Sequence, residues 1–99
     1  MWECGVKAGR TDDLVEHVRT NVWPNVEAAE GFLGGDILRS VARGQERLLL
    51  VTRWSDESAL ERFLGPRWTA HELTPVPEEE VFIEGVPFVD NWRPATSAS

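Results

Sequence analysis

The chain has 99 residues, 41% of them hydrophobic and 27% charged, and this length suits one domain with a single core. The formal net charge of -7 and a pI near 4.7 repel a phosphate backbone, so nucleic acid is excluded as the expected partner. The longest aliphatic run, Leu48 to Val51, is far shorter than the roughly 20 apolar residues of a membrane-spanning helix. The N-terminus offers no apolar signal-peptide core. We therefore expect a soluble, cytoplasmic protein that does not bind a membrane.

Cysteine and histidine, the usual ligands of zinc and iron, are scarce in this chain. A single cysteine, Cys4, excludes a disulfide framework and any multi-cysteine metal site, and its place on the apolar side of a strand predicts a buried, inert thiol. The histidines, His17 and His71, are far apart and have no carboxylate at ligand spacing. The sequence therefore predicts no metal and no other cofactor. Its unusual feature is an aromatic set of five Trp and four Phe without Tyr.

The first third of the chain predicts a strand followed by a helix. Residues Trp2 to Lys7 alternate, with Trp2, Cys4 and Val6 on one side. Thr11 is a candidate helix cap. Apolar residues then recur at helical spacing, at Leu14, Val15, Val18, Val22 and Val26. Because Pro24 removes an interior hydrogen bond, we expect a kink or a restart near Trp23-Pro24 and an end by Glu30-Gly31.

The middle of the chain predicts a hairpin and a second helix. Phe32 to Val41 alternates, with Leu33, Gly35 and Ile37 on one face, and Arg47 to Trp54 is a stronger strand. The short polar link between the two strands favours a hairpin. Ser55 or Asp56 can cap a helix that Gly65-Pro66 ends.

The last third predicts shorter elements. A helical turn is expected to carry Trp68 and His71, Pro75 to Pro77 form a stiff connector, and Glu80 to Glu84 form a strand. We interpret Glu78 to Glu80 as a solvated run beside an edge strand. Gly85 to Pro87 break or bulge the strand before an extended Phe88 to Trp92. We expect one domain over residues 1–93 and a flexible tail over 94–99.

The order β-α-β-β-α-β predicts an α+β, ferredoxin-like fold, in which two helices cover one face of a four-stranded antiparallel sheet. Leu49 and Val51 place apolar groups on the other face, which indicates an interface. We therefore expect a homodimer with the two sheets packed face to face. The segment Phe88 to Trp92 is a candidate to cross to the partner, and Trp2 and Trp92 are expected at the dimer contact.

Three segments carry a resemblance to a known family. They are Val6 to Arg10 at the first strand-to-helix turn, Ala29 to Gly35 into the second strand, and Leu50 to Leu60, a strand ending in Trp followed by a capped helix. In this order and spacing the chain resembles the antibiotic biosynthesis monooxygenase family of the dimeric α/β-barrel superfamily. The resemblance spans most of residues 2 to 84.

The resemblance implies a chemistry as well as a fold. Members named for it oxidise polycyclic phenolic polyketides with molecular oxygen, without metal or flavin, while related branches degrade haem, or isomerise or cyclise small metabolites. Haem-degrading relatives pair an Asn on the first strand with a helical Trp and a His. Those positions fall here at about Trp2, Phe63 and His71, so haem binding ranks below the other functions.

The candidate site residues are His71, Trp23, Trp54 and Trp68. An imidazole titrates near neutral pH, so His71 can take a phenolic proton; the alternative is a surface or capping histidine. Trp23 and Trp68 lie beside helix breaks, where indoles line cavity mouths or pack in a core, and Trp54 anchors the strongest strand. His17 matches no apolar stripe and is interpreted as solvated.

Two functions remain open from the sequence. In the first, a cofactor-independent monooxygenase binds a planar phenolic or polyketide-like metabolite among Trp23, Trp54 and Trp68, and His71 moves a proton. In the second, a non-catalytic dimeric module binds a small aromatic ligand or serves as an accessory protein, and the tryptophans are core residues.

Overall fold

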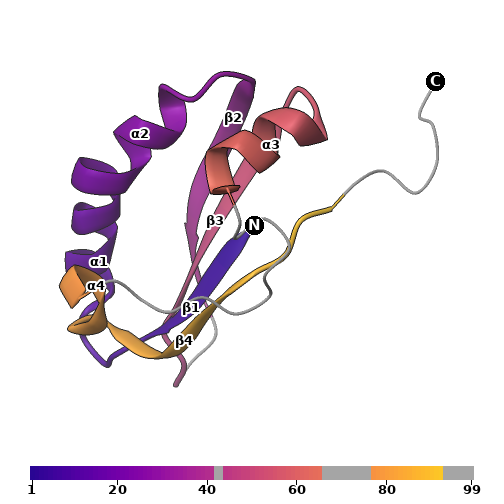
Figure 1. The fold of residues 1–99 in the computed structure, drawn as a ribbon. Helices are drawn as coiled ribbons and strands as arrows, with labels where there is room; N and C mark the ends of the chain where they lie inside the picture. Colours follow the sequence, from indigo (N-terminus) through magenta and orange to yellow (C-terminus); the bar gives the residue numbers. More distant parts are fainter. Residues whose placement is uncertain (42–43, 66–76, 93–99) are drawn as a thin grey trace.

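The computed structural model describes residues 1–41, 44–65 and 77–92 of the chain. They form an α+β, ferredoxin-like fold whose four-stranded sheet has the order β2-β3-β1-β4, with every neighbouring pair antiparallel (Figure 1). The elements are β1 (Trp2–Val6), α1 (Thr11–His17), η1 (Val18–Val22), α2 (Trp23–Glu27), β2 (Phe32–Arg39), β3 (Arg47–Trp54), α3 (Glu57–Leu64), α4 (Pro77–Glu80) and β4 (Ile83–Val89). The predicted fold class is confirmed.

The core lies between one face of the sheet and the first helical region. Alternation along β1 and β3 turns Cys4, Val6, Leu48 and Leu50 toward the helices, where all four are buried. They pack on Leu14 and Val18, at helical i, i+4 spacing. The predicted hairpin of β2 and β3 is confirmed by their antiparallel register.

The first helical region changes its winding in the middle. α1 passes into a π-helical turn, η1, and α2 then begins with Trp23 and Pro24. The predicted restart near Trp23-Pro24 is confirmed, and its cause is the missing proline N–H. Thr11, however, is the first helical residue and not a cap. Its hydroxyl donates a hydrogen bond to Glu46 at 3.0 Å.

Strand β2 departs from strict alternation. Its register with β3 shifts between Phe32 and Gly34, so a bulge turns Phe32 to the helix-covered face together with Ile37. Leu33 is left 67% exposed. The prediction that Phe32 and Ile37 face opposite sides was wrong because a period of two does not survive a bulge. The strand also ends at Arg39, two residues before the predicted end.

The C-terminal part differs most from its prediction. Residues Pro77–Glu80 form a helical turn, since proline suits a first helical position, and the strand begins at Ile83 instead of Glu80. The predicted bulge occurs at Gly85, which has a φ of +78°, opposite a register shift in β1. Phe88 pairs with Glu3 of the same chain, so this residue lies in the chain's own sheet. The expected helical turn with Trp68 and His71, and the tail over 94–99, lie outside the described residues.

The second face of the sheet is open along the described parts of the chain (Figure 1). Leu38 on β2 is 46% exposed and Phe88 on β4 is 38% exposed, and Leu49 of β3 lies between them in the register. We call Leu38, Leu49, Val51 and Phe88 the open face. Among the described residues, no helix has the length and apolar character needed to cross a bilayer.

Candidate functional site

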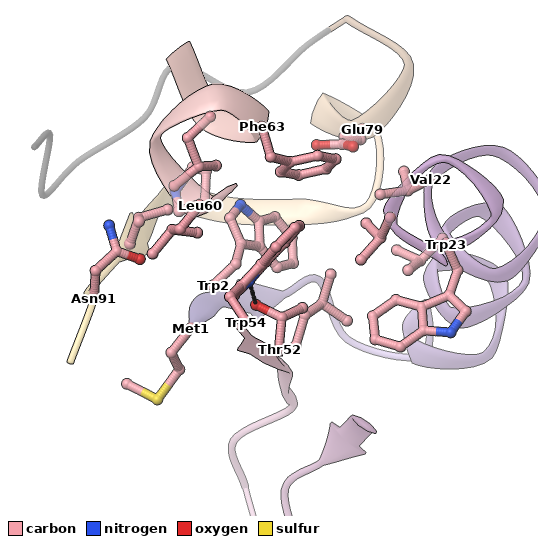
Figure 2. Close-up of a pocket in the computed structure, with 16 residues that line it drawn as sticks. Met1, Trp2, Val22, Trp23, Thr52, Trp54, Leu60, Phe63, Glu79 and Asn91 are labelled. Atoms are coloured by element: carbon pink, nitrogen blue, oxygen red, sulfur yellow. Dashed lines mark hydrogen bonds between the residues drawn. The ribbon is translucent and has the colours of Figure 1, made fainter. Parts of the chain in front are cut away.

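A cavity of about 220 Å³ lies between the helices and the covered face of the sheet. Its walls come from β1, η1, α2, β3, α3, α4 and β4, so that both halves of the chain contribute (Figure 2). Its aromatic lining residues are Trp2, Trp23, Trp54 and Phe63. The remaining wall is mostly aliphatic, with residues such as Val22, Leu50 and Leu60.

The aromatic rings form a continuous series of contacts along one end of the sheet. Trp23 meets Phe32 edge to face at a centroid distance of 6.0 Å, and Phe32 meets Trp54 in the same way at 5.6 Å. Trp54 then contacts Phe63 of α3 at 5.1 Å. Such pairs contribute about 0.5–1.5 kcal/mol each beyond their buried area, so the rings hold one another in place. The cavity wall is thus rigid aromatic surface.

Trp54 is fixed further by a hydrogen bond. Its indole Nε1–H donates to the hydroxyl of Thr52 at 2.9 Å, as the dashed line in Figure 2 shows. Because residues 52 and 54 lie on the same face of β3, the bond runs along the cavity wall. The indole therefore has its polar atom satisfied while its ring lines the cavity.

Gly35 allows Trp23 to approach the sheet. A Cβ atom at this position would collide with the carbonyl oxygen of Val51 and lie 3.0 Å from the Trp23 ring. A side chain here would therefore displace the indole or push β2 away from β3. Glycine at this position is what places Trp23 against the cavity.

A carboxyl group lies in this largely apolar wall. Glu79 of α4 lines the cavity, and its side chain is only 16% exposed. Burial raises the pKa of this carboxyl group above its ordinary value, because the ionised form loses water. The nearby His17, whose Nε2 lies 3.8 Å from the carboxylate, opposes that shift. The cavity therefore contains a proton acceptor of increased basicity.

The structure brings some of the predicted site residues together. Trp23 and Trp54 both lie in the cavity wall, whereas Trp68 and His71 lie outside the described residues. Trp2 was expected at a dimer contact, but the alternation of β1 turns it into the cavity. Trp92, the other tryptophan expected there, is 78% exposed.

Sequence reasoning missed Glu79 and misplaced His17. Glu79 was interpreted as part of a solvated run, but the turn of α4 brings it into the wall, and nothing in three consecutive glutamates distinguishes the middle one. His17 was interpreted as solvated, yet its side chain is 18% exposed and its ring lies 6.0 Å from that of Phe82. The apolar Phe82, three residues after Glu79, was the available signal for a packed turn.

The thiol of Cys4 takes no part in this chemistry. Its side chain is 1% exposed, and burial raises its pKa to about 12, with a further contribution from the charge of Glu79. The thiol therefore stays protonated at neutral pH, which confirms the predicted inert cysteine. In the parts of the chain that the structure describes, no three His, Cys, Asp or Glu side chains gather as a metal site.

The fold and its cavity define a small ferredoxin-like protein with a candidate ligand site between helices and sheet. The family model for antibiotic biosynthesis monooxygenase matches residues 2–67, and the chain belongs to this family. The family includes monooxygenases and proteins that bind or degrade haem, and its members typically form dimers and bind small ligands. A search of curated proteins finds no significant match.

Solved structures show the same fold at low sequence identity. A Bacillus cereus protein assigned to the antibiotic biosynthesis monooxygenases is 22% identical with a TM-score of 0.58, over 99% of this chain and 94% of the other. PA3566 from Pseudomonas aeruginosa is 20% identical with a TM-score of 0.59, over 95% and 90%. An arginine-to-serine variant of MhuD, with two manganese protoporphyrin IX molecules per active site, is 23% identical with a TM-score of 0.56, over 96% of each chain.

Proposed function

We propose that the chain binds a planar phenolic molecule in the aromatic cavity and oxidises it as a cofactor-independent monooxygenase. The observation that carries this proposal is the cavity wall, in which Trp2, Trp54 and Phe63 gather around one space (Figure 2). Rigid ring faces stack on a flat aromatic ligand and lose little side-chain entropy on binding. Family membership supports the reaction class.

The size of the cavity favours a compact ligand. Its volume of about 220 Å³ is below the roughly 300–1,000 Å³ typical of sites for drug-sized molecules. A flat molecule of two or three fused rings is therefore a better match than a porphyrin. The cavity volume therefore favours oxidation of a phenol over haem binding as the function.

The reaction requires the protein to bind the substrate, to orient it and to remove a proton from it. For an anthrone-type substrate, a ring CH₂ and O₂ become a ring C=O and H₂O, and the carbon supplies all four electrons that reduce oxygen. Deprotonation makes the substrate electron-rich enough to begin this transfer, and the apolar wall keeps water away from the reactive carbanion. His71 remains the sequence-based candidate for a proton-transfer group in this reaction.

We also propose that the protein acts as a homodimer that covers the open face. Leu38 and Phe88 expose apolar area on this face, beside the ion pairs Arg47–Glu3 and Arg53–Asp36. A second copy presents the same apolar centre and can bury it symmetrically. Proteins of this family typically form dimers, which supports this arrangement.

Binding of 2-naphthol, a flat two-ring phenol, tests the proposed ligand site. In ¹⁵N-labelled protein we expect saturable shifts of the Trp2 and Trp54 indole signals and of backbone signals of α3. The variant Val22→Phe fills the cavity from η1 and should abolish these shifts. The matched control Val81→Phe, at a residue that is 52% exposed and outside the cavity lining, should retain them. Shifts confined to the open face would contradict the proposed site.

A further inference from the structure

Among the described residues, Glu79 is the only one that brings a carboxyl group into the cavity wall, and the imidazole of His17 lies close to it. Glu79 comes from α4 and lines the same cavity as Phe63 and Val22, all three of which are labelled in Figure 2. The carboxylate is thus near the aromatic surface on which a flat ligand stacks.

His17 lies behind this carboxylate, at the end of α1. Its Nε2 is 3.8 Å from Oε1 of Glu79, and its Nδ1 is 3.3 Å from the side-chain amide nitrogen of Asn21. Because an amide nitrogen can only donate, Nδ1 accepts this hydrogen bond, and a ring proton is then carried on Nε2. The imidazole therefore presents an N–H to the Glu79 carboxylate.

We propose that Glu79 is the catalytic base of the cavity and that His17, oriented by Asn21, is a positioning residue that keeps the carboxylate ionised. This inference rests on the proposed function. Glu79 would accept the proton that leaves the substrate, while the electron pair stays on the substrate and reduces O₂. This proton returns to the peroxide that O₂ forms on the carbon. Loss of the second C–H proton then breaks the O–O bond, so that the carbon becomes C=O, one H₂O carries away both protons, and Glu79 is ionised again.

The surroundings of Glu79 give it the basicity that this role needs. Three groups face it: His17 from α1, Glu78 from its own helix, and the thiol of Cys4 from β1. Burial and the charge of Glu78 raise the pKa of Glu79, whereas His17 lowers it. A raised pKa reduces the gap to a phenol, so proton transfer costs less free energy than to an exposed carboxylate. The neutral Cys4 thiol adds no charge.

Excited-state proton transfer from bound 2-naphthol tests the base directly. The excited phenol is a strong acid, so it transfers its proton to a carboxylate within hydrogen-bond reach and emits as naphtholate. We expect naphtholate emission from the complex of the unaltered protein above the titration range of Glu79. The variant Glu79→Gln should bind the probe with unchanged affinity and emit as neutral naphthol. The matched control Glu80→Gln, at an exposed neighbour in α4, should retain the naphtholate band.

Naphtholate emission from Glu79→Gln at the unaltered level would overturn the base assignment and leave the ligand site intact. Failure of the unaltered protein to bind 2-naphthol would instead contradict the proposed function. In that case a pH titration of the Glu79 carboxyl ¹³C signal by NMR tests whether Glu79 and His17 interact. Because His17 lowers the pKa of Glu79, His17→Leu should move the titration to higher pH. An unchanged titration would overturn the His17 role.

With a turned-over substrate, the same pair predicts a pH dependence. The base acts when ionised, so kcat should rise with pH through the pKa of Glu79. His17→Leu should move this rise to higher pH and leave the plateau in place, which a purely structural defect would not do. Glu79→Gln should lower kcat by about 100-fold or more, the usual contribution of a general base. A rise at the same pH in all three proteins would contradict the pair.

Discussion

Gly35 shows how one residue sets the geometry of the cavity. Because a Cβ here collides with the Val51 carbonyl, Gly35→Ala should destabilise the protein by about 1–3 kcal/mol, the usual cost of overpacking. It should also weaken ligand binding, since the Trp23 ring must move. Urea unfolding measures the first effect and 2-naphthol titration the second.

The matched control for this change is Asp36→Ala, at the next residue of β2. Its side chain is 57% exposed and pairs with Arg53 at 3.5 Å, so its loss should cost less than about 1 kcal/mol. Equal stability of the Gly35→Ala and Asp36→Ala proteins would show that β2 and Trp23 adapt without strain.

Sequence patterns found the aromatic residues better than the polar ones. The tryptophans at 23 and 54 were singled out because breaks and strand ends place large rings near cavity mouths, and both lie in the wall. Trp2 was placed on the correct strand face, and it lines the cavity, whereas its position at the chain end had suggested a dimer contact. Glu79 depends on the turn of α4, which the Pro-rich sequence before it concealed.

At the scale of elements, the N-terminus of α3 is capped by the side chain of Asp56. The carboxylate of Asp56 accepts a hydrogen bond from the Ala59 N–H at 2.8 Å, and Glu57 adds a negative charge to the first turn. The helix carries Leu60 and Phe63 into the cavity wall. The cap therefore supports both the stability of the helix and the ligand site.

Removal of the cap should affect both properties together. Asp56→Ala is expected to lower the free energy of unfolding by about 1 kcal/mol and to weaken 2-naphthol binding. Asp56→Asn, which retains an accepting oxygen, should restore most of each loss. The measurements are urea unfolding and fluorescence titration, and an Asn variant no better than the Ala variant would argue against the cap.

Element order was predictable where hydrophobic alternation was regular. β1, β3 and the hairpin follow from side-chain period alone, and the proline at 24 marked the restart of the first helix. The bulge in β2 was harder to predict, because the extra residue at Leu33 reverses the face of the residues after it, whereas the glycine at 85 marked the bulge in β4. Helix α4 was missed since four residues are too few to show a helical period.

For the whole molecule, the open face makes the oligomeric state testable. Leu38→Lys places a charge on a half-exposed apolar residue of this face and should dissociate the proposed dimer. The control Val81→Lys is similarly exposed but lies in the turn after α4. Light scattering should find monomers for the first variant and dimers for the second. A monomeric unaltered protein would contradict the dimer.

The chain length and pattern were enough for the fold class, because β-α-β-β-α-β order leaves few alternatives. The cavity was not predictable in the same way, since its walls come from seven helices and strands that meet only after folding. Composition nevertheless pointed to its character. Three of the five tryptophans, Trp2, Trp23 and Trp54, line the cavity.

Oxygen uptake with 1,8-dihydroxyanthrone is the measurement closest to the central claim. We expect the protein to accelerate conversion to the anthraquinone and to consume one O₂ for each product molecule. The rate should saturate as the substrate concentration rises. The cavity-filling variant Val22→Phe should return the rate to that of spontaneous oxidation, while Val81→Phe should not. Equal rates with the unaltered protein and with Val22→Phe would contradict catalysis in this cavity.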